Sequence, residues 1–460
     1  MSDTVNKKEK KKLSTTKIIL LGFLCAIIIG TILLSLPCAT VSGESNVLTA
    51  LFTATTSICV TGLVVVDTFS YWTLFGKIVI LILIQLGGLG IVGFTSAIML
   101  VLNKKVSLKD RMIIQDAYNL STLQGVVRFI KKVIIGTFVI EFIGMLCYLI
   151  EFIPRFGIKK GIWYAFFNAI SAFCNAGIDI IGNDSLMSFN SSPVVLITTM
   201  MLIFNGGIGF VVWWDFLEIV RKIFKKEIQL KDFFKKLTIH SRIVLSVTFS
   251  LIFAGAFLIF IFEYNNKATI GDMTLGDKIL NSIFQSVTLR TAGFAAIDQG
   301  GLHETSVLVS IVLMIIGGSP VGTAGGIKTV TFVVLLFSVI SVVKGRKEAI
   351  IYNRSINEEL IRKSLAVTFI SVFVFFVFSI LLIATNDVSL TDATFEMASA
   401  VATVGLTRGI TSSLNAIGQV IVIIAMYLGR IGPISMFVAF SNKYTIKNSL
   451  HYAEADIIVG

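Results

Sequence analysis

The sequence predicts an all-α polytopic membrane protein made of four fused helix–pore-helix–helix repeats, with pseudo-fourfold symmetry around one ion pore. Of the 460 residues, 55% are hydrophobic and 14% are charged, and the mean hydropathy is +0.89. A water-soluble domain of this size is far more polar. Many apolar runs approach the roughly 20 residues that a helix needs to cross a bilayer. One short glycine loop recurs four times, at intervals of about 115 residues.

The first element of each repeat is an apolar segment long enough to cross a membrane. These segments cover residues 18–36, 133–153, 243–262 and 365–384. The first of them shows no small-residue cleavage pattern, so we interpret it as a transmembrane helix and not as a secretory signal. We place a basic N-terminus at 1–16 and the four repeats at 17–111, 112–227, 228–346 and 347–460, the last with a short C-terminus.

A shorter segment and a glycine loop come next in each repeat. The segments cover about 47–60, 163–175, 279–291 and 391–403, and each is too short to cross the bilayer. The loops contain "TSICVTGL", "SAFCNAGID", "TLRTAGF" and "ATVGLT". A half-crossing segment must return to the side from which it came. Non-helical backbone at membrane depth is tolerated only where it lines a cavity or is buried in protein. We therefore expect four pore helices whose loops meet on one axis.

A second spanning helix completes each repeat, at 74–102, 194–220, 306–343 and 416–440. Each of these segments carries a second glycine cluster about 25 residues after the loop glycine, beginning at Gly87, Gly206, Gly317 and Gly429. The third segment is too long for one span and contains "GGSPVGTAGGIKT". Five glycines and one proline are incompatible with a stable helix, so we expect this one to break at membrane depth.

The net charge of +12 follows the pattern of a membrane protein. Lys and Arg concentrate in 1–17, 103–111, 128–132, 221–242, 344–363 and 443–447, which flank the apolar runs. This positive-inside pattern predicts that both termini are cytoplasmic and that the glycine loops face outward. It argues against a nucleic-acid site, and contact with anionic lipid is the simpler alternative. The five cysteines form no C-x-x-C and the three histidines no H-E-x-x-H, so we expect no disulfide framework or metal-ligand cluster.

The chemistry of the four loops suits a dehydrated cation. Rings of backbone carbonyls can replace the hydration shell of an ion, and glycine permits the backbone angles that such loops require. Three acids, Asp67, Asp179 and Asp298, follow the loops; they either raise the local cation concentration or are simply solvated charges. Arg290 precedes the third loop glycine; we expect its side chain to point away from the pore and to anchor the loop, and direct control of the ion is the alternative.

On these motifs the chain resembles the Trk/Ktr/HKT superfamily of cation transporters over nearly its whole length, and its length is similar to that of Ktr-type membrane subunits. The resemblance implies one filter glycine per repeat, with neighbouring carbonyls as ligands of the transported K⁺. The implied filter residues are Val60, Thr61, Gly62, Asn175, Ala176, Gly177, Thr291, Ala292, Gly293, Thr403, Val404 and Gly405. Only the fourth loop reads Thr-Val-Gly, so the filter is less symmetric than that of a homotetrameric channel.

The resemblance also implies an intramembrane gating loop below the filter. The residues expected to form the gate are Gly317, Gly318, Gly322, Gly325, Gly326, Lys328 and Arg430. Arg430 lies within an apolar helix, where a charge is costly and points to a function; a structurally paired or snorkelling arginine is the alternative. The stretch "GTAGGIKT" differs by one residue from a phosphate-binding P-loop, but that motif needs a preceding strand in an α/β domain.

These observations predict a K⁺ uptake subunit of a bacterial inner membrane, which is not an enzyme and in which Na⁺ is either coupled or activating. A less selective Na⁺/K⁺ transporter is the nearest alternative. A membrane-embedded hydrolase would need a clustered set of acid, base or nucleophile, and we find none. The resemblance further implies a homodimer on a cytosolic ring of regulatory subunits that bind ATP and ADP. Nucleotide would therefore act only through a partner.

Overall fold

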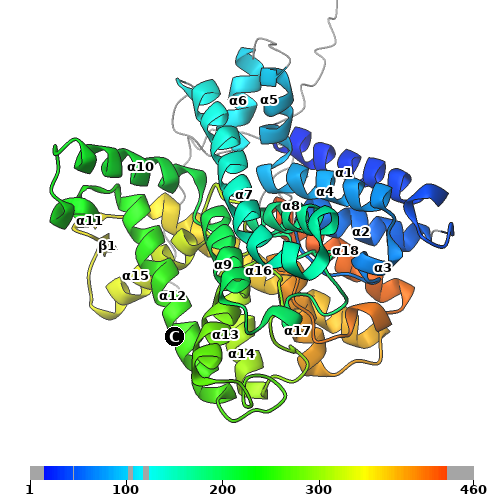
Figure 1. The fold of residues 1–460 in the computed structure, drawn as a ribbon. Coiled ribbons are helices and arrows are strands. Elements are labelled where there is room, and N and C mark those ends of the chain that lie inside the picture. Colours follow the sequence, from blue (N-terminus) through cyan, green and yellow to red (C-terminus); the bar gives the residue numbers. More distant parts are fainter. Residues whose placement is uncertain (1–14, 45, 102–106, 118–123, 433–460) are drawn as a thin grey trace, which may run out of the picture.

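The computed structural model describes residues 15–44, 46–101, 107–117, 124–432 and is almost entirely helical (Figure 1). Within these ranges the only paired strands are β1 (Ile350–Ile351) and β2 (Arg354–Ser355), which form one antiparallel hairpin. The all-α class predicted from the sequence is therefore confirmed. The predicted basic N-terminus and the C-terminal segment after residue 432 lie outside the described residues, apart from residues 15 and 16.

Four helices of the described part are long and apolar enough to cross a membrane, and they are the predicted first helices of the repeats. They are α1 (Thr15–Leu34), α7 (Val126–Phe156), α12 (Ile239–Glu263) and α16 (Glu358–Thr385). Each leaves large apolar side chains uncovered, such as Ile32, Phe142, Phe253 and Phe369, which are between 57% and 69% exposed. A surface of this kind suits contact with lipid chains and not with water.

The pore helices agree with the predicted segments to within a few residues. They are α2 (Val47–Cys59), α8 (Ile158–Cys174), α13 (Leu275–Thr288) and α17 (Leu390–Ala402). Polar N-cap side chains start three of them, where Asn46, Thr274 and Ser389 accept hydrogen bonds from backbone N–H groups of the first turn. The small, hydroxyl-rich C-terminal turns are buried at the centre of the molecule.

The second helices are less continuous than the sequence suggested. The first repeat has α4 (Leu74–Leu89) and α5 (Ile91–Val101), separated by Gly90 at φ +74°. The second has α9 (Pro193–Gly207) and α10 (Phe210–Phe224), bent by 103° beside Gly209 at φ +90°. A positive φ cannot continue a right-handed helix. The continuous helices expected at 74–102 and 194–220 are therefore wrong.

The third and fourth second helices follow the prediction more closely. The third is interrupted as expected: α14 (Glu304–Ile315) and α15 (Thr329–Val343) are joined by the loop 316–328, which we call the intramembrane loop. The fourth, α18 (Ala416–Ile431), ends beside Gly432, and the rest of the predicted 416–440 helix lies outside the described residues. Short elements connect the repeats: α3 (Thr68–Tyr71), α6 (Leu108–Ala117), α11 (Phe233–Lys236) and the 3₁₀ turns η1 (Pro37–Ala39), η2 (Met187–Phe189), η3 (Leu230–Asp232) and η4 (Thr411–Ser413).

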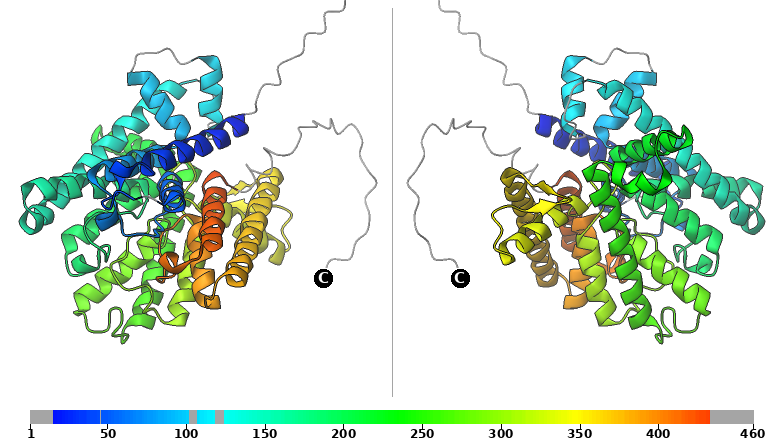
Figure 2. Two further views of the ribbon diagram at one scale, coloured as in Figure 1. Left: turned by 90° about the vertical axis from the view of Figure 1, so that its right-hand side faces the viewer. Right: turned by 90° about the vertical axis from the view of Figure 1, so that its left-hand side faces the viewer.

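The repeats are joined into a closed ring by one recurring contact. The first part of each second helix packs against the pore helix of the following repeat: α4 against α8, α9 against α13, α14 against α17, and α18 back against α2. Figure 2 shows the consequence, with the N-terminal and C-terminal helices lying side by side although they are far apart in sequence. This circular packing brings the four pore helices, and the loops that follow them, to the centre.

Candidate ion-conduction site

The four loop glycines meet at the centre of the ring, each against the backbone of the next repeat. A methyl group added to Gly62 would lie 2.6 Å from the carbonyl oxygen of Ala176. The same test places Gly177 2.6 Å from the oxygen of Ala292, Gly293 2.5 Å from that of Val404, and Gly405 against that of Thr61. The contacts thus run through repeats one, two, three and four and return to one. All four glycines have positive φ, between +63° and +103°. No side chain fits at these positions without displacing the neighbouring loop.

Hydroxyl groups of the pore helices hold the loop backbones in place. Thr56 Oγ1 accepts a hydrogen bond from the N–H of Gly62 at 3.0 Å, and Ser399 Oγ accepts one from Gly405 at 2.9 Å. In the second repeat Ser171 Oγ accepts from Ile178 at 3.2 Å. All three hydroxyl residues stand six positions before the loop glycine, a signal that the sequence contains and that our prediction missed. In the third repeat Thr288 donates to the carbonyl of Phe294 at 2.7 Å instead.

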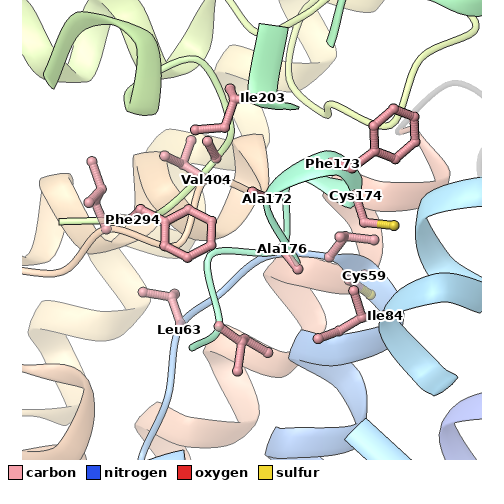
Figure 3. Close-up of a cluster of buried hydrophobic side chains, with 14 of the residues drawn as sticks. Cys59, Leu63, Ile84, Ala172, Phe173, Cys174, Ala176, Ile203, Phe294 and Val404 are labelled. Carbon is pink, nitrogen blue, oxygen red and sulfur yellow. The ribbon is translucent and has the colours of Figure 1, made fainter. Parts of the chain in front are cut away.

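The residue two positions before each glycine also has a left-handed backbone, with φ between +51° and +67°. These residues are Val60, Asn175, Thr291 and Thr403. For a β-branched residue this conformation is strained, by about 1–3 kcal/mol, and it persists only where the surroundings impose it. The close-up in Figure 3 shows side chains of the loops from all four repeats gathered in one cluster, among them Leu63, Ala176, Phe294 and Val404.

An outer cavity of about 320 Å³ opens over the ring and is lined by all four loop glycines. Asp67, Asp179 and Asp298 line it too, as does Asp184, so the acids predicted near the loops do lie at the mouth. The one basic residue of this lining, Arg408, is 2.7 Å from Asp392. The mouth therefore carries an excess of negative charge, which raises the local concentration of cations.

The ionisation of Asp179, at the outer mouth, is perturbed by its surroundings. This residue lies in the loop between α8 and α9, outside the membrane-spanning helices. Burial raises its pKa to about 6, hydrogen bonds with Ser185 and the N–H of Ile181 act in the opposite direction, and the neighbouring Asp67 and Asp184 raise it further. Below about pH 6 this carboxyl becomes neutral, so the mouth loses one negative charge.

The intramembrane loop lies directly beneath the ring of glycines. Gly325 packs against the side chain of Thr403, and a methyl group there would stand 2.7 Å from the carbonyl oxygen of Ala402. On the opposite side, Thr323 Oγ1 donates a hydrogen bond to the carbonyl of Phe173, at the end of α8, at 3.2 Å. The loop thus reaches from the fourth repeat to the second, across the ring of glycines.

Further backbone hydrogen bonds fix the intramembrane loop to the second repeat. The N–H of Ser319 donates to Gly207 at 2.9 Å, and the N–H of Thr323 donates to Gly206 at 3.0 Å. Gly322 and Gly318 both approach the backbone of this glycine pair, where a methyl group would lie 2.8 Å from the Gly206 oxygen and 3.0 Å from the Gly207 oxygen, respectively. The glycines of the intramembrane loop and of α9 therefore allow the two backbones to pack closely, because they carry no side chain at the contact.

Arg430 connects this loop to the first repeat. From the last turn of α18, its guanidinium donates to the carbonyl of Thr323 in the loop and to the carbonyl of Gly87 in α4. Lys328 lies nearby, where its ammonium donates to the carbonyl of Ala324 at 2.6 Å, and both basic residues line a cavity of about 170 Å³ between the loop, α16 and α18. The sequence predicted a role for Arg430 because it is a charged residue within an apolar helix, but it did not predict the hydrogen bond to Gly87.

Arg290 points away from the filter, as predicted: it is buried and donates to the carbonyl of Gly317 at 2.9 Å and to that of Thr248 at 3.3 Å. The P-loop-like stretch from Gly322 to Thr329 follows a helix, not a strand, and its lysine is bonded to the loop's own carbonyls. The context required for a phosphate-binding P-loop is therefore absent from this described segment.

Comparison with known proteins gives the same classification. The model of the TrkH family, described as cation transport protein, matches residues 7–452. The chain belongs to the TrkH family of cation transport proteins. A Ktr system potassium uptake protein B of Bacillus subtilis is 38% identical over 96% of both chains, and a potassium/sodium uptake protein of Enterococcus hirae is 35% identical over 99% of both.

The solved structures support the fold independently. The chain superimposes on the crystal structure of the potassium transporter TrkH from Vibrio parahaemolyticus with a TM-score of 0.71, at 16% identity, over 95% of this chain and 86% of the other. Family membership places the protein among membrane-embedded cation transporters and not among enzymes, as the sequence predicted. Among the described residues, no three or more His, Cys, Asp or Glu side chains are grouped so that they could hold a metal ion.

Proposed function

We propose that this chain is the ion-translocating subunit of a potassium uptake system, with K⁺ as substrate. The observation that carries the proposal is the closed ring of Gly62, Gly177, Gly293 and Gly405, each against a carbonyl of the next repeat. In this proposal the carbonyls of the twelve residues 60–62, 175–177, 291–293 and 403–405 form the ion sites. Relatives along the full length of the chain carry potassium uptake in their names, which supports K⁺ as the ion.

The pathway would be gated by the intramembrane loop together with Lys328 and Arg430. The loop would obstruct the axis, and its glycines Gly317, Gly318, Gly322, Gly325 and Gly326 supply close backbone packing without side-chain bulk. Opening requires the loop to leave its contacts with Phe173 and Thr403. Arg430 holds the closed position, because it ties the loop to α4 across the ring.

The remaining features of the proposal concern ions, partners and location. The name of the Enterococcus hirae relative, a potassium/sodium uptake protein, supports a Na⁺-dependent or less selective mode as the second candidate. The word "system" in the names of other relatives supports a multi-component assembly, for which we propose a homodimer bound to a cytosolic ring of nucleotide-binding regulators. The protein would lie in the inner membrane of a bacterium, with both termini in the cytoplasm. Its four repeats would cover residues 17–111, 112–227, 228–346 and 347–460.

Growth rescue tests the proposed function directly. The chain is expressed in a bacterium that lacks its own potassium uptake systems, with and without the cognate regulator, and growth is measured at low external K⁺. We expect rescue by the parent chain and loss of rescue by Gly293→Asp, because a carboxylate would enter the ring beside Val404. Failure of the parent to rescue, with the protein present in the membrane, would refute the proposal.

A further inference from the structure

One buried polar side chain stands behind the filter in every repeat. It lies nine residues before the loop glycine in repeats one, two and four, and eight residues before it in repeat three, where the pore-helix hydroxyl is also displaced by one position. The residues are Thr53, Asn168, Gln285 and Glu396, and none is more than 3% exposed. Polar groups are rarely buried without a partner, since each unpaired group costs free energy. The partners of these four side chains therefore indicate what they do.

Glu396 holds the outer half of the fourth filter loop. Thr407 Oγ1 donates to one carboxylate oxygen at 2.7 Å, and Thr411 Oγ1 donates to the other at 2.5 Å. Thr407 also accepts a hydrogen bond from the N–H of Gly409 at 3.1 Å, which closes the network over the stretch after Gly405. No salt bridge to Glu396 exists in the part of the chain that the structure describes. Its two oxygens are used entirely to bind the loop.

Gln285 makes the equivalent connection in the third repeat. Its amide nitrogen donates to Gln299 at 2.6 Å, and Gln299 donates back at 3.1 Å. Gln299 stands six residues after Gly293, as Thr411 stands six residues after Gly405. An amide pair in the third repeat and a carboxylate with a hydroxyl in the fourth therefore join the pore helix to the far end of the loop, at positions that are equivalent apart from the one-residue shift of Gln285.

The third and fourth loops are also joined to each other. Arg408 donates to the carboxylate of Asp392 at 2.7 Å and to the carbonyl of Gln299 at 3.2 Å. The equivalent position of the second repeat is not used in this way, because both polar atoms of the Asn168 amide have no hydrogen-bond partner among the described residues. The outer halves of loops three and four therefore form one hydrogen-bonded unit, and that unit includes half of the carbonyl ring.

We propose that Glu396, with Gln285, is a positioning residue that fixes the outer halves of the third and fourth filter loops and thereby sets the preference for K⁺ over Na⁺. The inference rests on the proposed function. A smaller ion is rejected only if the carbonyl rings resist contraction around it, which is one of the two accounts of selectivity in such filters. A brace behind the loops supplies that resistance, and its loss lets the loops close around Na⁺.

The test compares the initial uptake of K⁺ and of Na⁺ by the full-length protein in proteoliposomes, at equal concentration and membrane potential. Glu396→Leu removes both acceptors, and we expect the K⁺/Na⁺ uptake ratio to fall about fivefold or more, the effect of one net hydrogen bond. Glu396→Gln keeps one carbonyl acceptor, and we expect a change of less than about twofold. A parental ratio in Glu396→Leu would overturn the proposal.

The control is a second buried carboxylate, which holds the turn after α12 and the start of α14. Glu263, at the end of α12, accepts hydrogen bonds from Asn266 at 2.6 Å, from Thr269 at 2.7 Å and from the N–H of His303 at 3.0 Å. Glu263→Leu should lower thermal stability without changing the uptake ratio. An equal loss of selectivity in Glu263→Leu would refute a local role for Glu396.

A milder variant keeps the test decisive if Glu396→Leu is not recovered folded. Thr411→Val removes one of the two donors, and we expect the ratio to fall about twofold to threefold; a parental ratio would overturn the proposal in the same way. The proposed function fails separately, because it requires that the parent protein take up K⁺. If the parent protein transports K⁺ and neither Glu396→Leu nor Thr411→Val changes the K⁺/Na⁺ uptake ratio, only the role of Glu396 is refuted.

Discussion

Replacement of Arg430 by alanine should open the pathway. The guanidinium makes two hydrogen bonds that join the intramembrane loop to the first repeat, one to Thr323 and one to Gly87. A hydrogen bond from a charged group contributes about 1.5–3 kcal/mol. Opening breaks the bond to Thr323 and uncouples the loop from α4, whereas the bond to Gly87 joins α18 to α4 and does not involve the loop. Because Arg430 is only partly buried, we take the lower value for the one bond that breaks, so about 1.5 kcal/mol favours the closed state.

A loss of about 1.5 kcal/mol shifts the equilibrium between closed and open states by about tenfold. Flux through a mostly closed population should therefore rise by up to about tenfold in Arg430→Ala. The assay is ⁸⁶Rb⁺ uptake into proteoliposomes without the regulator, normalised to reconstituted protein. Arg155→Ala is the matched control, because Arg155 pairs with Glu151 on the half-exposed surface of α7. Flux at or below the parental level in Arg430→Ala, with folded protein, would refute this account of the gate.

Three further predictions concern the filter and its mouth. Gly62→Ser should abolish the preference for K⁺, because the new side chain would collide with the neighbouring loop and because the φ of +103° at this position is strained for serine. Retention of full K⁺/Na⁺ discrimination in ion-replacement flux would contradict the filter assignment. Thr56→Val removes the hydroxyl that holds the N–H of Gly62 and should lower stability by about 1 kcal/mol and weaken selectivity, measured by thermal unfolding and flux; a selectivity unchanged from the parent would count against it. Lowering external pH through about 6 should raise the KM for K⁺, because Asp179 is neutralised, and Asp179→Asn should remove this step; a pH response that persists in the variant would exclude Asp179 as its source.

Much of this architecture could be predicted because the chain repeats itself. The loop glycines and the apolar first helices recur with one spacing, and the structure places them as the repeat predicts. The breaks at Gly90 and Gly209 were missed for a physical reason. An isolated glycine in an apolar run is compatible with a continuous helix, and whether its φ becomes positive depends on the tertiary contacts around it.

The polar contacts of the site were harder to foresee. The bond of Arg430 to Gly87 joins residues at opposite ends of the chain, and only the circular packing of the repeats brings them together. The hydroxyl of Thr56 and the carboxylate of Glu396 carry a signal in their fixed distance from the loop glycine. That signal has meaning only when the pore helix and its loop are aligned across all four repeats, with the one-residue shift of the third repeat taken into account.

The central claim, that the four loops bind the transported cation, is tested most directly by crystals of the protein grown in Rb⁺, with data collected at the rubidium absorption edge. The account predicts anomalous density on the axis of the ring, within coordination distance of the carbonyl oxygens of Thr61, Ala176, Ala292 and Val404. Density confined to other cavities, with none at the ring in a protein that transports Rb⁺, would contradict it.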